Sequence, residues 1–288
     1  MWITFACLSA VFAALTAILA KCGVKKTNSD VGIAIRTSVV LVLAWVVTLI
    51  TGEYKQINSI TTRSLIFLLA SGVATGASWI CYFKALSLGE VSKVAAVDKS
   101  SVLISVLFAM VFFPQERNMW YVKIACLAAI AFGTYLMTDI KKGDYKTKAG
   151  WFIFAVLSAA FAAATSILAK IGIEGTPSNL ATAIRTCVVF VMAWLIVVCR
   201  GEIKLVKEVD VKETFFLLLS GVATALSWLC YYYALANGKV SVVVPIDKMS
   251  ILLTVLFSLI VFKVKFSFKE WSGLFLLTVG TVCMAVFT

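Results

Sequence analysis

The sequence predicts an all-α integral membrane protein with ten transmembrane helices in two inverted five-helix repeats. Three observations lead to this prediction. Of the 288 residues, 62% are hydrophobic and 14% are charged, and the mean hydropathy is +1.02. Long apolar runs recur along the chain, and its two halves repeat each other. Soluble proteins are about 45–50% apolar and about 25% charged, so this composition excludes a single water-soluble core.

The apolar runs are each about 20 residues long, which is enough to cross a hydrocarbon core of roughly 30 Å as a helix. Backbone polar groups in lipid need partners within the chain, so each run is predicted to be helical. Polar turns separate the runs. The predicted helices span residues 3–20, 31–50, 64–86, 91–113, 119–138, 150–169, 180–199, 214–235, 240–262 and 271–287.

The second half of the chain repeats the first at an offset of 149 residues. For example, SGVATGASWICYFKAL from Ser71 matches SGVATALSWLCYYYAL from Ser220. The register holds from the first helix to the fourth of each half and shifts by two residues before the fifth. A repeat this similar is a specific sign of duplicated structure. We therefore assign the first repeat to 1–142 and the second to 143–288.

Each repeat has an odd number of helices, so the second must enter the membrane upside down relative to the first. The loop charges agree. Three basic residues follow the first helix and one follows its equivalent, whereas one follows the fourth helix and three follow the ninth. In order, these are Lys21, Lys25 and Lys26; Lys170; Arg117; Lys263, Lys265 and Lys269. Basic loops stay in the cytoplasm, which places both termini outside.

The formal net charge of +12 is therefore attributed to membrane loops, and no nucleic-acid partner is predicted. The sequence has no His, which removes the commonest metal ligand and general base. Its 8 Cys form no CxxC pair and lie in or beside apolar runs. A nucleophile elbow is also absent. These observations disfavour a membrane-embedded enzyme, and we predict no cofactor and no metal.

The order of motifs along both halves resembles the EamA-type transporters of the drug/metabolite transporter superfamily. The resemblance covers essentially the whole chain. The motif residues are Lys21 and Lys170 closing the first helix of each half, Arg36 and Arg185 inside the second, Tyr82 and Tyr231 near the end of the third, and the turn Glu116-Arg117 after the fourth. The resemblance implies export, less often import, of small metabolites such as amino acids by alternating access.

Two Asp-Lys pairs lie at equivalent positions about two turns inside the fourth and ninth helices. They are Asp98-Lys99 and Asp247-Lys248. A charge deep in a membrane helix costs about 2.5–3.5 kcal/mol on insertion scales, so these groups need partners or a function. One interpretation is a ligand site or a proton-linked gate. The other is a structural cluster in which each Asp meets the Lys of the other repeat.

Two arginines, Arg36 and Arg185, lie about five residues inside the second and seventh helices. They snorkel to lipid headgroups in one interpretation and form an anion clamp in the other. Inside the predicted helices, four residues are positively charged (Arg36, Arg185, Lys99 and Lys248) and two are negatively charged (Asp98 and Asp247). Positive charge therefore exceeds negative charge by two. That surplus suits a substrate that bears a carboxylate or a phosphate, provided that the arginines do not face headgroups.

Aromatic residues gather near the ends of the third and eighth helices. They include Trp79, Tyr82, Trp228 and Tyr231, with Tyr232 and Tyr233 next to the last of these. Trp and Tyr commonly form belts at the membrane interface. The alternative is a cavity wall that stacks on a small ligand or makes cation–π contacts with it.

We predict a secondary transporter, most naturally an exporter, of a small polar metabolite such as an amino acid or an organic ion. It works by alternating access around a midplane cavity, with proton or cation coupling at the Asp residues. The predicted location is the plasma or inner membrane, surrounded by lipid, and a monomer suffices because one chain contains both repeats. The alternative function is a flippase for a lipid-linked or amphiphilic substrate.

Overall fold

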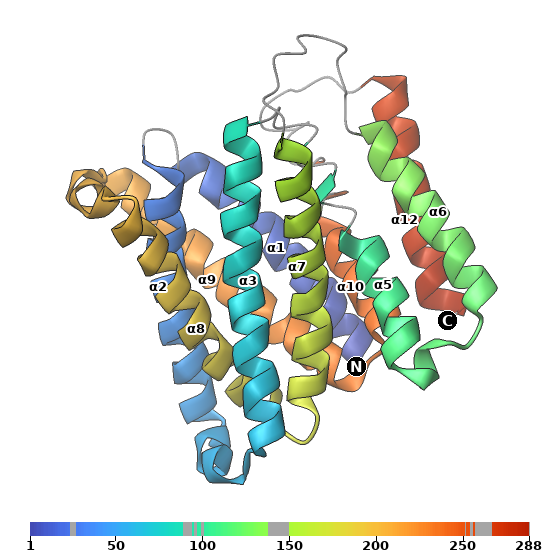
Figure 1. Ribbon diagram of the computed structural model, residues 1–288, viewed down its shortest axis with the longest axis horizontal. Coiled ribbons are helices and arrows are strands. Elements are labelled where there is room, and N and C mark those ends of the chain that lie inside the picture. Colours follow the sequence, from blue (N-terminus) through green and yellow to red (C-terminus); the bar gives the residue numbers. More distant parts are fainter. Residues whose placement is uncertain are drawn as a thin grey trace. The chain divides into compact units, whose positions relative to one another are not determined.

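The computed structural model describes residues 1–23, 27–88, 94, 97–98, 101–137, 150–250, 252–253, 256 and 267–287. The described chain is helical throughout (Figure 1). Its α-helices are α1 (Trp2–Gly23), α2 (Ser29–Ile50), α3 (Thr62–Leu88), α5 (Ser101–Phe112), α6 (Trp120–Met137), α7 (Trp151–Ile173), α8 (Ser178–Cys199), α9 (Val211–Asn237), α10 (Val240–Lys248) and α12 (Phe268–Phe287). Short 3₁₀ helices are η1 (Glu53–Ser59), η2 (Pro114–Glu116) and η3 (Glu202–Glu208).

These helices coincide with the predicted runs except at the fourth and ninth, which are described only in part. The ninth run was predicted as one helix over 240–262, but α10 ends at Lys248. The N–H of Met249 bonds to the carbonyl of Ile246 (2.9 Å), a tighter i→i+3 turn than an α-helix makes. Pro245, which has no N–H to donate, lies inside this short helix and weakens it.

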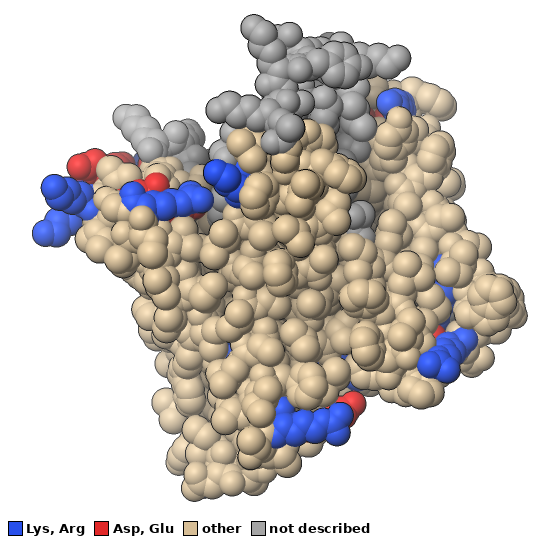
Figure 2. Space-filling model, in the orientation of Figure 1, with Lys and Arg blue, Asp and Glu red and all other residues tan. Residues whose placement is uncertain are grey.

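The helices carry the apolar outer surface of a membrane protein. Seven of the described helices are long and apolar enough to cross a bilayer. On α2, for example, Val42 and Leu49 expose 60% and 54% of their surface although both are strongly apolar. Figure 2 shows charged side chains near the ends of helices on the visible face, with surface free of Lys, Arg, Asp and Glu between them. This distribution matches a hydrocarbon solvent rather than water.

The structure divides into two compact units, and each mixes segments of both sequence repeats. The first unit comprises Met1–Gly76 and Leu168–Gly238. The second comprises Ala77–Ile167 and Lys239–Thr288. In the first unit, α1 packs against α9, and α2 packs against α8 and α9. In the second, α6 packs against α12, and α10 packs against α5 and α12.

Helices α2 and α8, the equivalent second helices of the two repeats, run antiparallel. Glu53, just after α2, accepts hydrogen bonds from Asn179 Nδ2 (2.6 Å) and from the Leu180 N–H (3.1 Å) at the start of α8. At the other end, Arg200, just after α8, forms an ion pair with Asp30 in the first turn of α2. The end of each helix therefore meets the start of the other.

The contacts between α2 and α8 also exchange residues in pairs. Trp45 Nε1 of α2 donates to Cys187 Sγ of α8 (3.3 Å). Reciprocally, Trp194 Nε1 of α8, which is equivalent to Trp45, donates to Ser38 Oγ of α2, the equivalent of Cys187 (3.1 Å). Such an exchange is the sign of a pseudo-twofold axis. Because the helices are antiparallel, the axis crosses them at right angles, as inverted repeats require.

The fifth helices of the repeats, α6 and α12, show the same exchange in the second unit, where they lie side by side (Figure 1). A Cβ added to Gly133 of α6 would lie 2.6 Å from the carbonyl oxygen of Gly273 in α12. A Cβ added to the equivalent Gly280 would lie 3.0 Å from the carbonyl oxygen of Cys126 in α6. Glycine at both positions lets the two backbones approach closely, as small residues do in membrane helix pairs.

Replacing Gly133 with alanine is expected to destabilise the α6–α12 pair by about 1–3 kcal/mol, because the new methyl group meets backbone atoms that cannot turn aside. Unfolding by SDS titration in mixed micelles measures this change. Phe132→Ala provides a control on the same helix, since this side chain is 55% exposed. Equal losses of stability in the two variants would contradict close packing at Gly133.

Candidate functional site

Arg185 of α8 is among the most deeply buried side chains of the described structure, with 1% of its surface exposed. Its Nε donates to Ser71 Oγ (3.3 Å) and its Nη2 donates to Thr75 Oγ1 (2.6 Å). Both hydroxyls belong to α3 and lie one turn apart, which places them on one face of that helix. Arg185 therefore points into the protein and does not snorkel to lipid headgroups.

Two aromatic rings of α9 lie against the Arg185 guanidinium. Its Cζ is 5.1 Å from the ring centroid of Trp228 and 4.6 Å from that of Tyr232. Tyr231 packs edge-on against Tyr232, with 5.1 Å between ring centroids. The structure thus brings the predicted residue Trp228 to Arg185. The tyrosine ring that lies against the guanidinium is that of Tyr232, whereas the predicted Tyr231 contacts the ring of Tyr232. The rings of Trp228 and Tyr232 therefore make cation–π contacts with a side chain of the protein itself.

The charge of Arg185 is not neutralised within the described structure. Its polar partners there are hydroxyls, and no carboxylate is among them. Its Nη1 is buried and has no hydrogen-bond partner. Burying a charge without a counter-ion costs several kcal/mol of folding free energy. The guanidinium of Arg185 is therefore in an unfavourable position unless other contacts hold it there. The arrangement provides what an anion needs: a fixed positive charge and an unused N–H donor.

Arg36 of α2 is the equivalent residue of the first repeat and has a related environment. Its Nη2 donates to Thr224 Oγ1 of α9 (3.2 Å), the equivalent of the contact between Arg185 and Thr75. The Thr224 hydroxyl also shares a hydrogen bond with Thr16 of α1 (3.2 Å). The Nε of Arg36 is buried without a partner. Unlike Arg185, Arg36 is partly exposed.

In the second unit, Asp98 is half-buried and is held by a hydroxyl group. Ser158 Oγ of α7 donates to Asp98 Oδ1 (2.7 Å), and Ser78 Oγ of α3 donates to the carbonyl of Ser158 (3.0 Å). Tyr82, one turn after Ser78, packs against a small apolar cluster around Ala85. Trp79 also lies in α3 and is half-buried.

The Asp98–Lys248 ion pair that the sequence suggested is absent from the described structure. The ion pairs there are Glu116–Lys123 and Asp30–Arg200. Asp98 instead accepts the hydrogen bond of Ser158. Lys99 lies outside the described residues, so the second suggested pair, Asp247–Lys99, is not described either.

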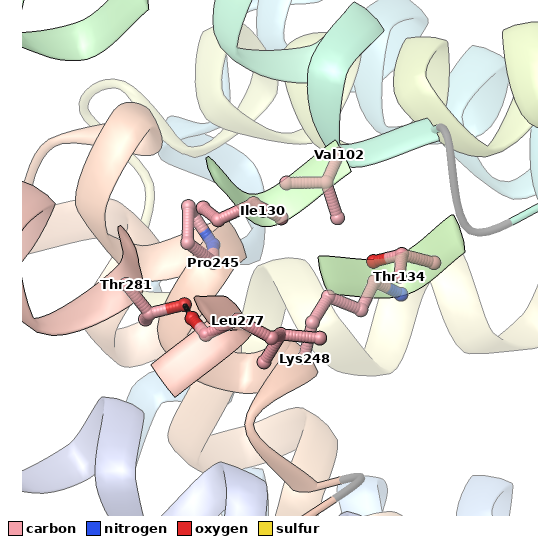
Figure 3. A pocket seen from close by; sticks show the side chains of 7 residues that line it. All are labelled: Val102, Ile130, Thr134, Pro245, Lys248, Leu277 and Thr281. Atoms are coloured by element: carbon pink, nitrogen blue, oxygen red, sulfur yellow. Dashed lines mark hydrogen bonds between the residues drawn. The ribbon is translucent and has the colours of Figure 1, made fainter. Parts of the chain in front are cut away.

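Lys248, the last residue of α10, lines a cavity of about 20 Å³ in the second unit, close to the volume that one water molecule requires. Figure 3 shows its side chain running along the cavity toward Thr134. The lining residues are Val102, Ile130, Thr134, Pro245, Lys248, Leu277 and Thr281. Asp247, the preceding residue, is half-buried. In this conformation the cavity has room for a water molecule and not for a metabolite.

The structure reveals a buried charge pair that the sequence analysis did not select. Lys123 of α6 is 0% exposed, and its Nζ lies 3.2 Å from Glu116 Oε2 and 2.6 Å from the Glu116 carbonyl oxygen. Glu116 also accepts hydrogen bonds from the Val240 N–H (2.5 Å) and from the Ser241 hydroxyl at the start of α10. Its carboxylate therefore caps α10 from another segment. The sequence signal for this pair is Lys123, a charged residue inside the predicted apolar run 119–138.

Lys170, one of the motif residues, has a structural role. Its Nζ donates to the carbonyl oxygens of Leu235 (2.6 Å), Ala236 (3.3 Å) and Gly238 (2.8 Å). These groups lie at the end of α9, where carbonyls have no partners within the helix, so the ammonium group caps that helix. The side chain of Lys21, its equivalent, lies outside the described residues.

Groups of three or more His, Cys, Asp or Glu residues able to hold a metal ion are absent from the described residues. The prediction of no cofactor and no metal remains a prediction.

Comparison with known proteins identifies similar sequences for both halves of the chain. The EamA-like transporter family matches residues 1–138 and again residues 149–286. An "uncharacterized transporter in cobO 3'region" from a Sinorhizobium species is 42% identical over 129 residues, which cover 44% of this chain and 92% of that protein. An uncharacterized protein of Methanocaldococcus jannaschii is 28% identical over 134 residues, covering 46% of this chain and 95% of that protein. Both relatives thus have about the length of one repeat.

A solved crystal structure has the same fold. It superposes with a TM-score of 0.78, covering 98% of this chain and 96% of its own. The sequence identity is 15%, so this likeness shows the fold alone.

Proposed function

Because the chain belongs to the EamA-like transporter family, we propose that it is a secondary transporter that exports a small polar metabolite, such as an amino acid or an organic ion. The chain is a multi-pass membrane protein with two EamA repeats, and its family consists of transporters, not enzymes. Transport proceeds by alternating access, in which a binding site near the midplane opens to one side of the membrane and then to the other.

The observation that carries this proposal is the antiparallel exchange of contacts between equivalent helices. The pairs Trp45–Cys187 and Trp194–Ser38 relate the two repeats by an axis that crosses α2 and α8. A chain with this symmetry has two related conformations available, one for each side of the membrane. A scaffold has no use for such a pair of states, whereas a transporter requires them.

The proposed site residues fall into two groups with different tasks. The arginine, lysine and aromatic side chains bind substrate. The two aspartates couple transport to a proton or a cation. The binding residues are Arg36, Arg185, Lys99, Lys248, Trp79, Trp228, Tyr82 and Tyr231; the coupling residues are Asp98 and Asp247. Support comes from the buried hydroxyl and aromatic partners of Arg185 and from the half-buried, hydroxyl-bound carboxylate of Asp98.

The proposed location is the plasma or inner membrane, with both termini outside. The bias of Lys and Arg toward one set of loops supports this orientation. One chain contains both repeats, so we propose that a monomer suffices. The repeats span 1–142 and 143–288, and the matches to the family over 1–138 and 149–286 are compatible with these limits.

Counterflow in proteoliposomes tests the proposed function. Vesicles containing the purified protein are loaded with one unlabelled amino acid or organic acid and then given a trace of the labelled compound outside. For a substrate, the label accumulates transiently to several times its equilibrium level. Vesicles without protein provide the baseline. Absence of accumulation across the panel, together with movement of a labelled lipid between leaflets, would replace the transporter with the alternative function, a flippase.

A further inference from the structure

We propose that Arg185 is the binding site for an anionic group, a carboxylate or a phosphate, carried by the transported metabolite. This inference rests on the proposed function and narrows its substrate class from polar metabolites to anionic ones. The site lies within the first compact unit, where α3, α8 and α9 meet at the Arg185 guanidinium.

The donors of the guanidinium are used unequally. Nε and Nη2 donate to the α3 hydroxyls, and Trp228 and Tyr232 lie against the planar group. These contacts fix the orientation of the guanidinium, while Nη1 is buried with no hydrogen-bond partner. An N–H donor of a fixed cation that has no acceptor can form a strong hydrogen bond with a ligand, because charge-assisted hydrogen bonds are about twice as strong as neutral ones. A carboxylate or phosphate oxygen supplies both the missing acceptor and the missing negative charge.

A purely structural role explains this arrangement poorly. A structural arginine is normally paired with a carboxylate, as Arg200 is with Asp30. The hydroxyl of Thr75 already donates to the Ser71 carbonyl oxygen (3.0 Å), so it remains satisfied when Arg185 is removed. The uncompensated charge of Arg185 therefore destabilises the folded protein in this conformation. We attribute its presence to the binding of an anionic group.

Thermal unfolding of the detergent-purified protein tests the site directly. The probes are sodium acetate and sodium phosphate, compared with sodium chloride at the same ionic strength. A ligand at ten times its Kd shifts the folding equilibrium about elevenfold, so the wild-type protein gains a saturable increase in its unfolding midpoint. The variant Arg185→Gln has a midpoint in chloride that is no lower than that of the wild type, and it loses the increase produced by acetate and phosphate. Arg63→Gln is the matched control, because Arg63 is exposed and its loss removes the same charge.

Several outcomes overturn the proposal. Equal midpoint increases in wild-type and Arg185→Gln protein would mean that the anions act on the general surface. A lower midpoint for Arg185→Gln in chloride would assign a structural role to the arginine. If Arg185→Gln does not fold, Arg185→Lys, which keeps the charge but lacks the planar fork, is expected to show a smaller increase than wild type. An increase in Arg185→Lys equal to the wild-type increase would contradict the proposed geometry.

A lipid headgroup also carries a phosphate, so a second measurement distinguishes the two sources. Nanodiscs of phosphatidylglycerol and of phosphatidylcholine present different headgroup charges. The proposal expects the acetate effect in both lipids, whereas stabilisation by phosphatidylglycerol alone, lost in Arg185→Gln, would assign the site to lipid and overturn the substrate assignment. The counterflow assay tests the transport function independently of anion binding at Arg185. Anion binding at Arg185 without any counterflow rejects the transport function, and counterflow of neutral metabolites alone rejects this inference.

Discussion

Replacing Glu116 with alanine is expected to lower the free energy of unfolding by about 3–5 kcal/mol, because it leaves a buried ammonium group unpaired. Lys123 is 0% exposed and contacts the Glu116 carboxylate at 3.2 Å. The same substitution removes the acceptor for the Val240 N–H and the Ser241 hydroxyl, so α10 also loses its cap.

SDS titration in mixed micelles measures this loss, and a double-mutant cycle assigns it. The variant carrying both Glu116→Met and Lys123→Met removes both charges and is expected to be more stable than the sum of the two single changes predicts. Arg117→Met is the control at the adjacent position, where the arginine is exposed and donates to the Met110 and Val111 carbonyls. We expect that change to cost under about 1 kcal/mol. A small effect of Glu116→Ala would show that the pair contributes little to stability.

The fold was accessible from the sequence because its two strongest signals are local. Apolar runs of membrane-spanning length predict helices wherever they occur, and α1, α2 and α6 to α9 follow the predicted runs closely. The duplication adds the long-range information, since an odd number of helices per repeat forces inversion. The structure confirms this inference through one pair of contacts, Trp45–Cys187 and Trp194–Ser38.

The pairing of buried charges was less accessible, because sequence position does not reveal which side chains meet across helices. One of the two interpretations pairs Asp98 with Lys248, whereas in the structure a serine hydroxyl from α7 is the partner of Asp98. Serine is common in membrane helices, so Ser158 carries no special signal. Lys123 went unselected because it lies close to the start of its apolar run, where a lysine usually reaches the interface. Its burial depends on Glu116, which lies outside the run.

Asparagine in place of Asp98 is expected to abolish uptake in proteoliposomes while the protein still folds. The Asn Oδ1 accepts the hydrogen bond of Ser158 that Asp98 accepts now (2.7 Å), so the local structure survives the change. The ability to carry a negative charge and to take up a proton is lost. The half-buried Asp98 carboxylate has one hydroxyl partner and no ion pair in the described structure, which is the observation behind its proposed role in coupling.

The initial rate of uptake of a counterflow-positive compound, driven by a pH gradient or a sodium gradient, measures this effect. We expect a decrease of at least about 100-fold, equivalent to about 2.7 kcal/mol, in Asp98→Asn. The same change at Asp210, an exposed residue before α9 whose side chain caps nothing, leaves the rate unchanged. Asp247→Asn examines the equivalent carboxylate of the second repeat. Undiminished transport in both Asp98→Asn and Asp247→Asn would remove these residues from the coupling mechanism, because no step of the cycle would then depend on their charge.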